Sequence, residues 1–190
     1  NGFYIDIGCF HPKYHSNTFK LYKKGWKGIN IDIDEYKIKN FNFFRKRDMN
    51  FACALSDKEN ELNIYMQSQS SYGSFTTLNH DFAKTHGSLL GREIRTKKLI
   101  SLTLNEVLNK YKMKKYLPSI DLLCIDVEGY ELEVLSGLDF KIYRPRVICS
   151  EIHANSLDSL LNNKVYKFIT NKNYKLVKWP SPSCIFISEI

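Results

Sequence analysis

Residues 3–33 read FYIDIGCFHPKYHSNTFKLYKKGWKGINIDI, and they set the pattern for the whole chain. One short apolar run ends at Gly8, and a second begins at Gly28. The stretch between them carries several apolar side chains and stops at Gly25, a residue type that commonly follows the end of a helix. Short apolar runs bounded by glycine are typical of strands. We therefore expect a strand, a helix and a second strand here.

The same alternation continues to the C-terminus. Further strands are expected at residues 51–55, 61–66, 120–125, 146–151, 174–177 and 184–187. Further helices are expected at residues 104–111, 130–136 and 157–168, the first of them behind a Thr-x-x-Glu capping box. The polar stretch 67–77 should be a loop, and the last two strands should pair as a hairpin. This order predicts an α/β, doubly wound, mostly parallel sheet with a C-terminal antiparallel hairpin.

The size of the chain and its cysteines limit the class of protein. With 190 residues, 43% of them hydrophobic, it can bury one core, so we expect a single domain over residues 1–190. No run reaches the roughly 18 apolar residues of a membrane helix, and no secretion signal is visible. The start at Asn1, without Met, suggests a piece of a longer protein. The five scattered cysteines predict reduced thiols in a cytoplasmic protein.

The chain is basic, with a formal net charge of +8. Such a charge attracts anionic partners, for example phosphorylated glycans, nucleic acid or a membrane surface. However, the lysines and arginines are spread along the sequence and form no single long cluster. We therefore expect an ordinary solvated surface and no nucleic-acid partner.

Polar residues close the apolar runs at four places: Asp6 to Gly8, Asp32, Ala54 to Ser56, and Asp126 to Gly129. In a doubly wound sheet, ligands bind at the carboxyl ends of the strands, so these are the positions to inspect. A glycine there allows close approach, and an acid after the second strand can bind a ribose diol. The G-x-G-x-x-G spacing is absent, because bulky residues fill the turn at Cys9–Pro12. This favours a ligand without a pyrophosphate over a nicotinamide dinucleotide.

Several segments match a known family pattern when they are taken together. They are FYIDIG at 3–8, HP at 11–12, SNT at 16–18, YKKGW at 22–26, GINID at 28–32, ALSD at 54–57, IDVEGYELEVLSG at 125–137 and EIH at 151–153. In this combination the chain resembles the FkbM family of methyltransferases that use S-adenosyl-L-methionine (SAM). The turn at Cys9–Pro12 departs from the small Ala-Asn-x-Gly turn of many relatives.

The resemblance implies a seven-stranded, Rossmann-like class I methyltransferase fold. It also implies SAM as methyl donor, S-adenosylhomocysteine as product, and a hydroxyl of a sugar or glycan as acceptor. Fusion to other glycan-modifying domains is a further expectation of this kind. The residues that the resemblance places at SAM are Asp6 and Gly8 at its methionine end, Asp32 at its ribose, Ala54, Leu55 and Ser56 at its adenine, and also Asn17 and Asp126.

The reaction needs a base, because a sugar hydroxyl is a weak acid. We expect His153 in this role, since an unperturbed imidazole titrates near neutral pH, with Glu151 or Asp126 orienting it or acting in its place. A divalent metal held by Asp126, Glu128, Glu151 or His153 is the alternative, and the metal-free route is favoured. A structural alternative for Asp126 and Glu128 is a cap of the following helix together with a solvated acid. Without the family match, His153 would be interpreted as an ordinary loop histidine.

Two other functions stay open at this point. An RNA-modifying methyltransferase or an RNA-binding domain is the alternative that the net charge favours, although no aromatic and basic RNA-binding stretch is present. A nicotinamide oxidoreductase is disfavoured by the missing glycine pattern. The polar segment 67–95 is expected to face the acceptor, since long insertions in compact domains are often functional.

Overall fold

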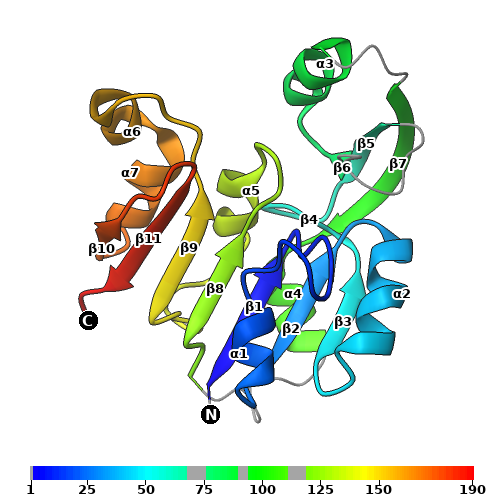
Figure 1. Cartoon of the computed structure of the whole chain (residues 1–190). Coiled ribbons are helices and arrows are strands. Elements are labelled where there is room, and N and C mark those ends of the chain that lie inside the picture. Colours follow the sequence, from blue (N-terminus) through cyan, green and yellow to red (C-terminus); the bar gives the residue numbers. More distant parts are fainter. Residues whose placement is uncertain (1, 68–75, 90–93, 111–118) are drawn as a thin grey trace.

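The structure is a computed structural model that describes residues 2–67, 76–89, 94–110 and 119–190. Its main element is a seven-stranded sheet with the order β10-β11-β9-β8-β1-β2-β3 (Figure 1). The strands of this sheet are β1 Phe3–Ile7, β2 Lys27–Asp32, β3 Met49–Ala52, β8 Leu122–Ile125, β9 Val147–Glu151, β10 Tyr174–Lys178 and β11 Ser183–Ser188. The first five run parallel, whereas β11 lies antiparallel between β9 and β10. The predicted fold class and the C-terminal hairpin are confirmed.

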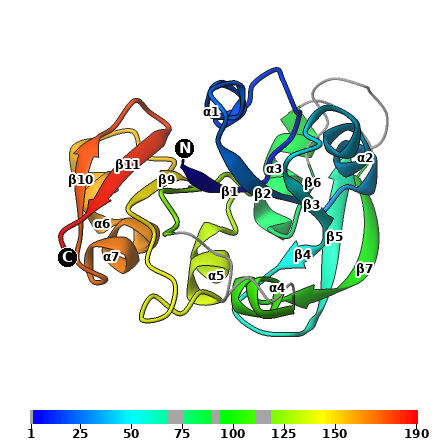
Figure 2. The same ribbon diagram turned by 90° about the horizontal axis from the view of Figure 1, so that it is seen from below.

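Helices cover both faces of this sheet. On one face lie α1 (Phe19–Lys23) and α2 (Glu35–Phe44), and on the other lie α4 (Leu104–Lys110), α5 (Glu131–Ser136) and α7 (Lys164–Thr170), the last preceded by α6 (Leu157–Asn162) (Figure 2). The core residues with no solvent exposure include Ile5, Ile29, Leu104, Leu108, Leu123, Leu135 and Ile148. Burial of these apolar side chains from both layers stabilises the sheet and fixes the strand ends that carry the site.

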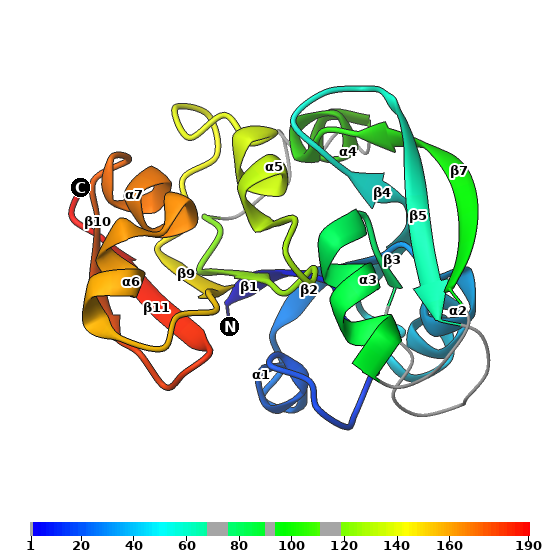
Figure 3. The same ribbon diagram turned by 90° about the horizontal axis from the view of Figure 1, so that it is seen from above.

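A second, four-stranded sheet with the order β4-β7-β5-β6 lies beside the β3 edge (Figures 1 and 3). Its strands are β4 Ala54–Leu55, β5 Glu61–Gln67, β6 Thr76–Thr77 and β7 Ile94–Leu102. The helix α3 (His80–Leu89) lies between β6 and β7 in the sequence. The run expected as one strand at 51–55 therefore divides between the two sheets. It does so at Cys53, whose backbone N–H donates to the carbonyl of Asp32 at 3.1 Å. This bond holds the start of β4 against the end of β2.

Some elements differ from the sequence prediction. The sequence pattern does not predict the helices α2 and α3 or the strand β7. Within α2 only Ile38 and Phe41 are buried, so its apolar residues show only a weak helical periodicity. Strand β7 exposes residues 95–98, so it lacks the usual alternation. The helix expected at 157–168 is two helices, because the backbone of Asn163 is extended and its side chain accepts from the Val165 N–H at 2.8 Å. Of the loop expected at 67–77, residues 68–75 lie outside the described residues, and β6 ends it.

The cysteines and the helices bear on two expectations about the whole chain. All five cysteines are free thiols, as expected for reduced side chains. Burial raises the pKa of Cys53 and of Cys184 to about 11, which keeps both thiols protonated at neutral pH.

Among the described residues, no helix has the length and apolarity to cross a lipid bilayer.

Candidate functional site

A cavity of about 340 Å³ lies at the carboxyl ends of β1, β2 and β8, within the size range of small-ligand pockets. Its lining includes seven of the residues predicted to bind the cofactor: Asp6, Gly8, Asn17, Asp32, Ala54, Leu55 and Asp126. The eighth, Ser56, does not line it. The backbone N–H of Ser56 donates to the carbonyl of Leu102 at 2.9 Å, and its hydroxyl donates to Asp57. Parallel packing of the strands thus brings together segments that are far apart in the sequence.

Glycine is required at position 8 because the ends of β1 and β8 approach each other closely there. Its φ of 76° lies in the left-handed region, and its N–H donates to the carbonyl of Ile31 at 2.8 Å. A Cβ at this position would lie 1.7 Å from the backbone oxygen of Asp126. Glycine was expected here to let a ligand come close, and the structure shows that it lets the β1 and β8 ends come close.

Asp6 is a buried acid at the end of β1, with 4% of its surface exposed. The hydroxyl of Thr18 donates to its Oδ2 at 2.6 Å. Burial raises the pKa of Asp6 to about 6, while the hydrogen bond from Thr18 and the positive charge of Arg45 act in the opposite direction. The carboxyl group therefore changes charge close to neutral pH.

Asp32 ends β2 and is held by the backbone of two loops. Its Oδ2 accepts from the Phe10 N–H at 3.2 Å, and its Oδ1 accepts from the Asp34 N–H at 2.9 Å. The ammonium group of Lys37 lies 3.5 Å from Oδ2. Burial raises the pKa of Asp32, and Lys37 opposes this shift. A carboxylate offers about four acceptor sites, so the group can still accept from a ligand diol.

The predicted catalytic residues also come together, at the ends of β8 and β9. One carboxylate oxygen of Glu128, one of Glu151 and one ring nitrogen of His153 lie within 4.8 Å of one another. The Nε2 atom of His153 is 3.4 Å from Oε2 of Glu151. Burial raises the pKa of Glu151 to about 8, and the neighbouring carboxyl group of Asp126 acts in the same direction. We refer to Asp126, Glu128, Glu151 and His153 as the acid–imidazole cluster.

The comparison with known families agrees with this geometry. The methyltransferase FkbM domain matches residues 6–176, which include every residue of the site described above. The chain belongs to the FkbM methyltransferase family. A search among curated proteins found no match. The family resemblance is confirmed, and this FkbM domain is a methyltransferase.

The acid–imidazole cluster of this FkbM domain has ligand atoms that suit a metal as well as a proton. Two carboxylates and one imidazole are a set that could hold a hard divalent cation such as Mg²⁺ or Mn²⁺. The same groups can also pass a proton from a hydroxyl to the imidazole. The two possibilities differ in their response to a chelator, which provides a test.

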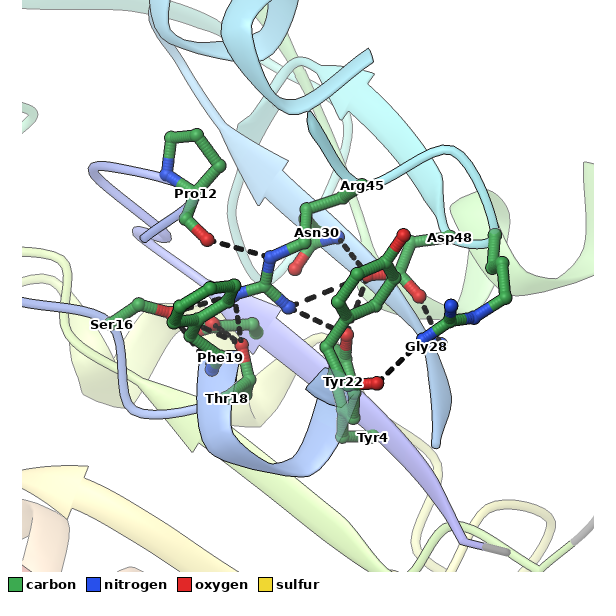
Figure 4. Close-up of polar contacts among 12 residues, drawn as sticks. Tyr4, Pro12, Ser16, Thr18, Phe19, Tyr22, Gly28, Asn30, Arg45 and Asp48 are labelled. Atoms are coloured by element: carbon green, nitrogen blue, oxygen red, sulfur yellow. Dashed lines mark hydrogen bonds and ion pairs between the residues drawn. The ribbon is translucent and has the colours of Figure 1, made fainter. Parts of the chain in front are cut away.

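Arg45 is a residue of the FkbM domain that the sequence did not single out. It is fully buried, and its guanidinium group lies between Tyr4 of β1 and the loop that joins β1 to α1 (Figure 4). The bonds that it donates go to Pro12 O at 2.7 Å, Tyr4 Oη at 2.9 Å, Ser16 Oγ at 2.9 Å and Thr18 Oγ1 at 3.5 Å. Asp48, 3.6 Å away, supplies the counter-charge. Because Ser16 and Asn17 line the cavity, Arg45 positions one of its walls.

Glu131 is the second residue that sequence reasoning missed. Its Oε1 accepts from the backbone N–H groups of Val127 and Gly129, each at 3.1 Å. These bonds hold the turn after β8, where Glu128 and Gly129 both have positive φ. Positive φ at a non-glycine residue stores strain and is often found at functional sites.

Proposed function

We propose that this FkbM domain takes SAM as methyl donor and methylates a hydroxyl group of a sugar or glycan. The charge of the cavity carries the proposal. Among the described residues, its lining includes the carboxylates of Asp6, Asp32, Asp126 and Glu128 and one lysine, Lys37, although the chain has a net charge of +8. A cavity of this sign favours a ligand with positive groups. SAM carries a sulfonium and an ammonium group, whereas a dinucleotide carries a negative pyrophosphate.

The lining also fits the parts of SAM in order. Asp32, after β2, is placed to accept from the ribose hydroxyls, as acids at this position do in related sheets. Ala54 and Leu55 are buried and give an apolar wall for adenine. Asp6, with Asn17 and Asp126 nearby in the lining, offers acceptors for the methionine end.

The protein must then orient a weakly acidic hydroxyl and take its proton. SAM supplies a methyl group on positive sulfur, already activated for transfer to oxygen. We assign the proton to His153, whose side chain is 58% exposed and lies against Glu151. Glu151 orients the imidazole through its contact with Nε2, and the carboxylate of Asp126 nearby stabilises the positive charge of the ring once it is protonated. Positioning of the two substrates contributes most, on the order of several kcal/mol.

The affinity for SAM should rise as the pH increases through about 6, where Asp6 loses its proton. The ionised carboxylate attracts a positive ligand, and the protonated form does not, so affinity is lost on the acid side. Thr18→Val removes the hydrogen bond that stabilises the ionised form, and it should move the midpoint to higher pH. Calorimetry between about pH 5 and pH 7.5 measures both effects. An affinity that is constant over this range would exclude Asp6 from the SAM site.

Asp32→Ala should weaken SAM binding by about 1.5–3 kcal/mol, because hydrogen bonds to a charged acceptor are lost. Glu35→Ala is the matched control, since Glu35 is an exposed acid on the next helix. Calorimetry with SAM, S-adenosylhomocysteine and NAD should show binding of the first two only. Wild-type affinity in Asp32→Ala would remove this residue from the ribose site.

The function itself is tested with methyl-labelled SAM and a library of glycans, read by mass spectrometry. We expect the label on a glycan hydroxyl. Label on RNA in place of glycan, under the same conditions and with salt-dependent binding, would support the RNA-modifying alternative and contradict the proposal.

A further inference from the structure

A second, shallower depression of about 430 Å³ adjoins the acid–imidazole cluster. Its lining residues are His153, Ala154, Asn155, Ser159, Ser181 and Pro182. They come from the connection between β9 and α6, from Ser159 in the first turn of α6, and from the turn between β10 and β11. The connection and the turn lie at the end of the sheet where β9 finishes (Figure 1).

Hydrogen bonds hold the two walls of this depression together. The Ile152 N–H donates to the carbonyl of Pro182 at 2.9 Å, and Ser183 pairs with Glu151 in the sheet. In the first wall, Ser156 and Ser159 form a reciprocal capping box at the start of α6. The depression is therefore preformed, a property that lowers the entropic cost of binding a ligand.

The depression and the main cavity share the acid–imidazole cluster as a boundary. Asp126 and Glu128 line the main cavity, and His153 lines the depression. Glu151 lies between them, with Oε2 buried and 3.4 Å from His153 Nε2. A base at this boundary could reach a hydroxyl group held in the depression while facing a methyl donor held in the cavity.

We propose that this depression is the acceptor subsite and that it takes a neutral, hydroxyl-rich sugar ring. The proposal rests on the proposed methyltransferase function and names its acceptor class. Among the described lining residues there is no lysine or arginine; they offer the imidazole of His153, the amide of Asn155 and the hydroxyl of Ser181, while the hydroxyl of Ser159 already donates to the carbonyl of Ser156. The amide and the Ser181 hydroxyl can both donate to and accept from sugar hydroxyls. Ala154 and Pro182 add small apolar surfaces for the C–H face of a ring.

The charge distribution agrees with a neutral acceptor. Residues 11–47 hold ten Lys and Arg against three Asp and Glu, which leaves only a small net charge on the rest of the chain. Most of this positive charge is carried by α1, α2 and their adjoining loops, and these two helices cover the face opposite α5 and α7 (Figure 2). By contrast, the acidic side chain of Glu128 lies beside His153 at the edge of the depression. Its negative charge would repel a phosphorylated glycan or a nucleic acid there.

The test is an NMR titration of the ¹⁵N-labelled chain saturated with S-adenosylhomocysteine. The probes are the methyl glycosides of glucose, mannose, galactose, rhamnose and fucose. At least one should shift the amide signals of residues 152–155, Ser181 and Ser183. Asn155→Ala and Ser181→Ala should each weaken this glycoside by roughly 2- to 10-fold, the effect of one hydrogen bond. Asn171→Ala, an exposed asparagine at the end of α7, should leave its affinity unchanged.

Each outcome of the titration is decisive. Failure of S-adenosylhomocysteine to bind contradicts the proposed function, and the subsite with it. Normal binding of S-adenosylhomocysteine without any glycoside shift in these two segments overturns the subsite alone. Tighter binding of glucose 6-phosphate than of methyl glucoside would overturn the neutral class of acceptor.

Discussion

His153→Ala should lower the single-turnover rate of methyl transfer by about two to four orders of magnitude, the usual contribution of a general base. The affinity for SAM should stay close to that of the wild type, because His153 does not line the main cavity. The loss then belongs to the transition state and appears in the rate of the chemical step. Rapid-quench measurements with a glycan acceptor from the library, together with calorimetry for SAM, separate the two quantities.

His153→Gln is the informative companion variant, because it can keep a polar contact with Glu151 but cannot act as a base. It should be as slow as His153→Ala, whereas Lys175→Ala, an exposed site on β10, should be unaffected. EDTA should leave the wild-type rate unchanged. A rate that EDTA abolishes and that Mg²⁺ or Mn²⁺ restores would instead place a metal on Glu128, Glu151 and His153. A normal rate for His153→Ala without metal would move the base to Asp126, Glu128 or Glu151.

Arg45→Met should destabilise the chain by about 3–5 kcal/mol, the cost of leaving a buried charge without its partner. Asp48 is the group left behind, and it also accepts from the Gly28 N–H at 3.0 Å and from Asn30 at 3.1 Å. For a domain of this size the melting temperature should fall by roughly 2–4 °C for each kcal/mol. Calorimetric or denaturant unfolding measures the change. SAM affinity should fall as well, because the loop carrying Ser16 and Asn17 loses its anchor.

Two further variants separate the effect of the unpaired buried charge on stability from the effect of the smaller side chain. Arg45→Met combined with Asp48→Asn should recover part of the lost stability, since no unpaired charge remains. Arg47→Met is the matched control: it removes an exposed arginine that stacks on Tyr22, and it should cost no more than about 1 kcal/mol. Equal stability for Arg45→Met and Arg47→Met would show that the Arg45 contacts contribute nothing net.

The strand ends of the site could be predicted because each is marked by a short sequence pattern, an apolar run followed by polar residues. An apolar run followed by Asp6 and Gly8, and another followed by Asp126, report a strand and its carboxyl end within a few residues. Parallel strands put their carboxyl ends on the same edge of the sheet, so the lining by Asp6, Asp32 and Asp126 could be expected. The combined motifs also carry the family assignment.

The sequence by itself thus determined the fold class, the hairpin and the edge of the sheet where the cavity lies. Tertiary structure alone decided that β4 leaves the main sheet, that Arg45 anchors the loop after β1, and that His153 lines a depression separate from the cavity of Asp6. The physical reason is the sequence separation over which each kind of interaction acts. Periodicity, caps and glycines act over a few neighbouring residues, whereas burial, strand order and charge pairing join residues such as Tyr4 and Asp48, which no local pattern connects.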